Sequence, residues 1–182
     1  LATLHEGLAL YPTAVELHVG VGYARLARDE FAWARRSFEE ALVLDPEHED
    51  GLAGLGETLL RFGQADAAKR IFARVRALGY EDDIELMQQI GRALFRDDEF
   101  EEALEYFEVA VRQAPDSAEA VALVGYTQHR LSQDEAAVET LRRALKTQTG
   151  DSTLLIVTQR VATVKGAEQI IVLEEGQMVG RG

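Results

Sequence analysis

The sequence predicts an all-α fold in which antiparallel helix pairs stack into a solenoid. Along residues 1–149 a small residue, an alanine and a large apolar residue each recur about every 34 positions, always in the same order. Self-similarity at a fixed period of this length indicates a repeat architecture. The composition suits such a fold, because 47% of the 182 residues are hydrophobic and 28% are charged.

Four positions of the repeat recur at the same intervals along this part of the chain. The small residues are Gly22, Gly56, Gly91 and Gly125, and the alanines are Ala34, Ala68, Ala103 and Ala137. Four residues after each alanine comes Phe38, Phe72, Phe107 or Leu141, and three further on Ala41, Val75, Ala110 or Ala144. We expect each glycine to mark a close approach of two helix backbones, with the large side chain filling the space beside it.

Each repeat is expected to hold two helices, because apolar residues recur at spacings of three and four rather than two. First helices are expected over 15–28, 49–62, 83–97 and 117–131, and second helices over 31–44, 65–78, 100–113 and 134–147. The turns between them are polar: Asp29-Glu30, Gly63-Gln64, Asp97-Asp98 and Ser132-Gln133. The repeats are then residues 15–48, 49–83, 84–117 and 118–149, after a half repeat at 1–14.

This pattern resembles the tetratricopeptide repeat family over residues 1–149. The resemblance rests on the Val/Leu/Ile-Gly pairs, on the alanine and phenylalanine positions above, and on Pro12 and Pro46, which end helices. The chain departs from the pattern where Tyr80 and Thr149 replace that proline. The resemblance implies a right-handed α-solenoid that binds another protein or a peptide in its concave groove.

Residues 150–182 follow a different pattern and are expected to form a short α/β-like tail. The segments 153–158, 169–173 and 178–180 predict short strands, and 161–167 predicts a helical turn or two. The run resembles the closing segment of an ABC-transporter nucleotide-binding domain, although Gln159 stands where that family has its switch histidine. The chain has no G-x-x-x-x-G-K-[ST] phosphate loop, so ATP binding is not expected. The alternatives are a passive appendage or a shield for the last repeat.

The charge and composition exclude several classes of function. A net charge of −13 argues against duplex nucleic acid and anionic membranes, because both are bound through summed Lys and Arg attraction. There is no cysteine, and the longest apolar runs are only about four residues, far from the roughly 20 that span a bilayer. We expect a cytoplasmic protein without membrane insertion. The oligomeric state is left open.

The sequence offers no catalytic constellation, so we expect a protein that is not an enzyme and has no cofactor. Gly51, Gly54 and Gly56 resemble a nucleotide loop, but they lie inside a predicted helix with no strand before it. The acidic run 45–50 lacks the spacing of a calcium loop. The histidines are scattered over separate repeats, and no metal site is expected: His5, His18, His48 and His129.

The family resemblance implies which residues face the concave groove. They are Tyr23, Leu26, Glu57, Leu60, Arg61, Gln88, Arg92, Phe95, Arg96, Tyr126, His129 and Arg130. Arginine pairs with carboxylates and stacks on rings, so we expect a partner with acidic and apolar residues. The competing interpretation is that these arginines only balance Glu57, Glu85 and Glu119.

The expected function is therefore a non-catalytic scaffold for protein–protein interaction. The Lys/Asn clamp of family members that bind chaperone tails is absent, which disfavours that ligand. Alternatives are a chaperone for secretion-system subunits, a relative of an ABC ATPase and, more remotely, a protein that binds single-stranded RNA along the groove.

Overall fold

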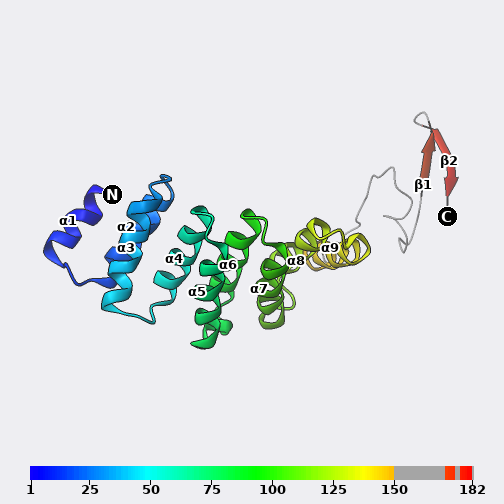
Figure 1. Ribbon diagram of the computed structural model, residues 1–182. Coiled ribbons are helices and arrows are strands. Elements are labelled where there is room, and N and C mark those ends of the chain that lie inside the picture. The colour runs from blue at the N-terminus through cyan, green and yellow to red at the C-terminus, as the bar shows by residue number, and fades with distance from the viewer. Residues whose placement is uncertain (150–170, 175–176, 182) are drawn as a thin grey trace.

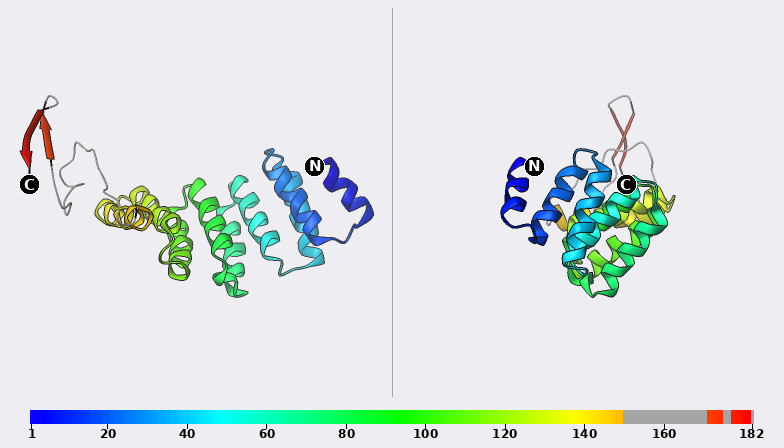
Figure 2. Two further views of the ribbon diagram at one scale, coloured as in Figure 1. Left: turned by 180° about the vertical axis from the view of Figure 1, so that it is seen from behind. Right: turned by 60° about the vertical axis from the view of Figure 1, so that its left-hand side comes forward.

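The computed structural model describes residues 1–149, 171–174 and 177–181. Residues 2–149 form a row of antiparallel helices that follow one another in chain order, as Figure 1 and the two views of Figure 2 show. After α1 (Ala2–Leu10), the first helices of the four repeats are α2 (Val15–Leu26), α4 (Glu49–Arg61), α6 (Ile84–Arg96) and α8 (Ala118–Arg130). The second helices are α3 (Phe31–Leu44), α5 (Ala65–Ala77), α7 (Phe100–Gln113) and α9 (Asp134–Thr149). The predicted all-α solenoid is confirmed.

The glycines pack as the repeat pattern predicts. A Cβ built at Gly22 would lie 2.6 Å from Phe38, and one at Gly91 would lie 2.5 Å from Phe107. Gly56 faces Phe72 in the same way, and Gly125 faces Leu141. The three phenylalanines are 0 to 1% exposed, so a buried ring of the second helix fills the space at three of these glycines, and Leu141 fills it at Gly125.

The turns inside the repeats share one backbone conformation. Each turn contains one residue with a positive φ of 58° to 68°; these residues are Asp29, Gly63, Asp98 and Ser132. The next amide bonds back to a carbonyl near the end of the first helix, for example Glu99 N to Leu94 O at 3.0 Å. This is the left-handed helix end that satisfies free carbonyls, and it accepts glycine and Asp more readily than bulky residues.

First helices after α2 begin with a side-chain cap. His48 Nδ1, Asp83 Oδ1 and Ser117 Oγ each accept an amide three residues on, at 3.3, 2.9 and 3.2 Å. The extra residue of the second repeat lies in the turn after α5, where Gly79 has φ 92° and Tyr80–Asp82 form a short 3-10 helix. Tyr80 replaces the helix-ending proline there without interrupting the array.

The described part of the C-terminal region is an antiparallel hairpin of β1 (Ile171–Glu174) and β2 (Gln177–Arg181). Ile171 pairs with Arg181 and Glu174 with Gln177, and the register shifts between Val172 and Leu173. The strands predicted at 169–173 and 178–180 overlap this hairpin. The predictions for 153–158 and 161–167 lie outside the described residues, and the domain boundary after residue 149 stays a prediction.

Candidate functional site

Polar side chains link the first helices of successive repeats along the surface predicted to bind a partner. The Tyr23 hydroxyl of α2 donates to the Asp50 carbonyl at the start of α4, at 3.0 Å. It also accepts from Gln89 Nε2 of α6 at 2.7 Å, across α4. Burial raises the pKa of Tyr23.

Two ion pairs continue these links toward the C-terminal end. Arg96 of α6 donates to Glu57 of α4, and Arg92 of α6 donates to Glu119 of α8. Arg92 also donates to Gln88 Oε1 at 2.9 Å. We call the twelve predicted groove residues the first-helix stripe. The links from α2 to α8 run through members of this stripe and through Asp50, Gln89 and Glu119 beside it. The pairs of Arg92 with Glu119 and of Arg96 with Glu57 also fit the competing interpretation, in which the arginines balance neighbouring carboxylates.

The other two arginines of the stripe turn toward the preceding repeat. Arg61 lies 3.5 Å from the Asp29 carboxylate, and its guanidinium lies 5.2 Å from the Phe31 ring. Arg130 repeats the arrangement two repeats later. It lies 3.0 Å from Asp98 and 4.1 Å from the Phe100 ring.

The acidic and aromatic partners of Arg61 and Arg130 were not among the predicted site residues. The signal was in the sequence, because Asp29 and Phe31 recur two repeats later as Asp98 and Phe100. Each set joins two repeats through an ion pair and a ring contact. We call these two sets the arginine staples.

Arg96 has no staple, because Gly63 and Ala65 occupy the corresponding positions of the second repeat. It turns instead to Glu57 within the stripe, and its side chain stays 56% exposed. Beside it is a small hollow of about 10 Å³, lined by Glu57, Leu60, Arg61, Ala93, Arg96 and Asp97. That volume suits about one water molecule. Asp97 lines this hollow, and its pKa is raised mainly by burial and secondly by the negative charge of Glu99.

The residues of the first-helix stripe differ widely in solvent exposure. Leu60 and Gln88 are buried at 2% and 7% exposure, and Leu26 and Phe95 pack partly against the core. His129 is exposed and lies 2.9 Å from Asp134 of its own repeat. Tyr126 is 58% exposed. The four arginines of the stripe are 43 to 56% exposed, but within the described residues only Arg61 and Arg130 also contact a ring.

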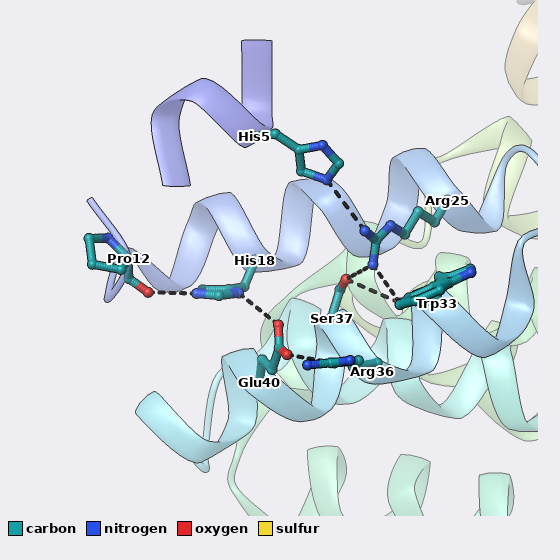
Figure 3. A network of polar contacts seen from close by, with 8 residues as sticks. All are labelled: His5, Pro12, His18, Arg25, Trp33, Arg36, Ser37 and Glu40. Atoms are coloured by element: carbon teal, nitrogen blue, oxygen red, sulfur yellow. Dashed lines mark hydrogen bonds and ion pairs between the residues drawn. The ribbon is translucent and has the colours of Figure 1, made fainter. Parts of the chain in front are cut away.

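The histidines contact different neighbours and are not grouped together. Figure 3 shows His18 between the Pro12 carbonyl, which its Nε2 meets at 2.7 Å, and Glu40, which lies 3.5 Å from Nδ1. Because a carbonyl only accepts, Nε2 is the donor of that bond. In the same network Arg25 donates to His5 at 3.3 Å. The described residues contain no group of three or more His, Cys, Asp or Glu side chains arranged to hold a metal ion.

The glycine run 51–56 lies inside α4, as predicted. Gly54 and Gly56 face the rings of Phe38 and Phe72, where an added Cβ would lie 2.3 and 2.2 Å away. These glycines therefore serve helix packing. In the part of the chain that the structure describes, no helix is long and apolar enough to cross a membrane.

Two family models, both described as tetratricopeptide repeat, match residues 25–89 and residues 89–152. The chain belongs to the tetratricopeptide repeat family. These matches end at residue 152, so they give no support to the resemblance of the C-terminal segment to an ABC-transporter domain.

This tetratricopeptide repeat protein is similar to one curated protein and to several solved structures. The Protein CTR9 homolog of Arabidopsis thaliana is 34% identical over 110 residues, which are 57% of this chain and 10% of that protein. The chain thus spans about a tenth of the length of that relative.

The solved structure of YrrB, described as a tetratricopeptide repeat protein with an unusual peptide-binding site, is 28% identical at a TM-score of 0.59. That match covers 82% of this chain and 77% of YrrB. MamA from Desulfovibrio magneticus RS-1 is 22% identical at a TM-score of 0.63, over 82% of this chain and 84% of MamA, which shows the fold alone.

Proposed function

We propose that the protein is a non-catalytic scaffold whose first-helix stripe binds a peptide segment carrying acidic and apolar residues. The observation that carries the proposal is the grouping of Arg92, Arg96 and Tyr126 as accessible side chains on one stripe of α6 and α8. Arg92 is 43% exposed and Arg96 56%. Aromatic and arginine side chains are the residues that most often anchor partners.

The ion pairs that Arg92 and Arg96 make are suited to exchange. The pair of Arg92 with Glu119, in which the side chains are 43% and 69% exposed, contributes about 0 to 1 kcal/mol, because water screens it and the side chains lose freedom in forming it. A ligand carboxylate that displaces Glu119 therefore replaces a weak internal contact. Glu57 is 13% exposed, so the ligand is expected to share Arg96 with it rather than to displace it. Arg61 and Arg130 serve a different role in this proposal, since each is held by an acidic residue and a ring of the preceding repeat.

The apolar part of the ligand is expected to contact Tyr126. Tyr126 has an exposed aromatic ring. It is the ninth residue of its repeat, as Arg92 is of the repeat before it, so the two residues occupy equivalent positions on neighbouring first helices. Toward the N-terminal end the Tyr23 hydroxyl is already hydrogen-bonded to the Asp50 carbonyl and to the Gln89 side chain. We therefore place the ligand mainly over α4, α6 and α8. The description of YrrB as having a peptide-binding site supports a peptide as the ligand class.

The test is a peptide array followed by solution binding. An array of nonapeptides that combine Glu with Leu and Phe identifies a binder, and fluorescence anisotropy of that dye-labelled peptide gives its Kd. We expect Arg92→Glu with Arg96→Glu to weaken binding by about 100-fold, because two charge-assisted contacts become repulsive, while helicity is retained.

The matched control is Arg35→Glu with Arg36→Glu on α3. These arginines make i,i+4 pairs with Glu39 and Glu40 on a second helix, so the change in charge is the same and lies off the stripe. The control is expected to bind like the parent. Equal binding by the parent and the Arg92/Arg96 variant, or no binder in the array, would refute the proposal.

A further inference from the structure

A larger hollow lies on the opposite side of α8 from Tyr126. It is a cleft of about 360 Å³ between α7, α8 and α9, lined by Glu108, Val111, Arg112, Val124, Gln128, Thr140 and Arg143. Val124 and Gln128 lie two residues before and after Tyr126, about 160° around a helix of 3.6 residues per turn. The cleft is therefore separate from the first-helix stripe.

The cleft is open because the last repeat lacks a ring that the repeat before it has. One repeat earlier, Tyr106 of α7 fills the corresponding space and is 5% exposed. Its ring lies 6.3 Å from the Phe72 ring and 5.5 Å from the Arg76 guanidinium, both on α5. Thr140 stands at the position of Tyr106 in the last repeat, and its shorter side chain leaves this space empty.

One residue that lines the cleft also has a buried polar atom without a partner. Gln128 stands where the preceding repeat has the buried Leu94, and its Oε1 is buried with no hydrogen bond to any described residue. In the first repeat the corresponding polar pair is satisfied, because Arg25 donates to Ser37 Oγ at 3.0 Å (Figure 3). A buried carbonyl without a donor is unfavourable, so the cleft favours an occupant that brings an O–H or N–H group.

The rim of the cleft carries two arginines for which the described residues supply no acidic partner. Arg112 and Arg143 line it, and within the described residues neither makes an ion pair. Arg76, which flanks the filled space one repeat earlier, pairs with Glu81 and Glu105. Guanidinium groups stack on rings and bind carboxylates, so the rim favours an aromatic residue with acidic neighbours, despite the single carboxylate of Glu108.

We propose that this cleft is a second binding site, which receives a tyrosine of a partner protein flanked by acidic residues. The tyrosine ring occupies the space that Tyr106 fills one repeat earlier, and its hydroxyl donates to Gln128 after rotation of the terminal amide. The flanking carboxylates pair with Arg112 and Arg143. The chain's own residues 150–182 contain no Phe, Trp or Tyr, so this segment does not supply the ring.

The probe is the peptide acetyl-Glu-Tyr-Glu-amide, titrated into the full ¹⁵N-labelled chain and followed by NMR. We expect saturable shifts of the Val111 and Thr140 amides and of the Gln128 side-chain amide. The same peptide with Ala in place of Tyr should shift none of them. Thr140→Tyr should abolish the response, because the new ring fills the cleft as Tyr106 fills the space before it.

Two further variants keep the result interpretable. Arg112→Glu with Arg143→Glu changes exposed side chains and should weaken the response at least about tenfold without altering the fold. Arg92→Glu with Arg96→Glu should leave it unchanged, which separates this site from the proposed groove. A response that persists in Thr140→Tyr, that lies only along the first-helix stripe, or that is missing at millimolar peptide would overturn the proposal.

Discussion

At the scale of single residues, the surroundings of a glycine decide what it contributes. Gly20 and Gly22 lie two residues apart in α2. A Cβ at Gly22 would lie 2.6 Å from the buried Phe38 ring, whereas one at Gly20 would lie 3.5 Å from Leu4, an ordinary contact. The repeat pattern of the sequence marks only Gly22, and the structure gives the reason.

Replacing these two glycines with alanine should therefore change the stability of the protein in opposite directions. Gly22→Ala is expected to destabilise the protein by about 1 to 3 kcal/mol, because the ring must move in a packed core. Gly20→Ala is expected to stabilise it by about 0.5 to 1 kcal/mol through helix propensity. Urea unfolding followed by circular dichroism measures both midpoints. Similar midpoints for the two variants would contradict the packing account.

At the scale of elements, the turn between the two helices of a repeat decides where an arginine of the next repeat points. Asp29 and Asp98 stand in the left-handed position of their turns and hold Arg61 and Arg130. Gly63 occupies the same position with φ 68°, and without a carboxylate there Arg96 pairs with Glu57. The turn residue thus decides whether the arginine of the next repeat pairs with the turn of the preceding repeat or with its first helix.

A carboxylate at position 63 should pair with Arg96, as Asp29 pairs with Arg61. Gly63→Asp is expected to draw Arg96 away from the stripe and to weaken binding of the acidic peptide by about tenfold. The fold should survive, because the left-handed conformation costs a non-glycine residue about 1 to 2 kcal/mol and Asp tolerates it well. Anisotropy with the array-selected peptide measures the change.

Gly63→Ala is the matched control for this prediction. It imposes the same backbone cost without a carboxylate, so its affinity for the peptide should equal that of the parent. If Gly63→Asp and Gly63→Ala bind the peptide equally, the turn residue does not control Arg96.

At the scale of the whole molecule, the helices and the glycine–ring contacts followed from the sequence because each depends on residues within one repeat. The predicted second helix 31–44 coincides with α3, and 100–113 coincides with α7. What the sequence did not predict are contacts that depend on how repeats pack together. The bond from Gln89 to Tyr23 joins residues two repeats apart, and the cleft beside Thr140 arises only when three helices meet.

The directions of the side chains within the stripe could not be predicted from the sequence either. The family resemblance placed four arginines on one face but could not distinguish Arg61 and Arg130 from Arg92 and Arg96. That distinction depends on which acidic side chain lies within reach across a repeat boundary. It is visible only once Asp29 and Asp98 are seen beside their arginines.

The proposed position of the ligand on the first helices is tested by amide hydrogen exchange of the full chain with and without the array-selected peptide. We expect bound peptide to slow exchange in α4, α6 and α8 and to leave exchange in α5 and α7 unchanged, because the ligand lies along the first helices. Slowed exchange confined to the second helices, or to the hairpin at 171–181, would contradict it.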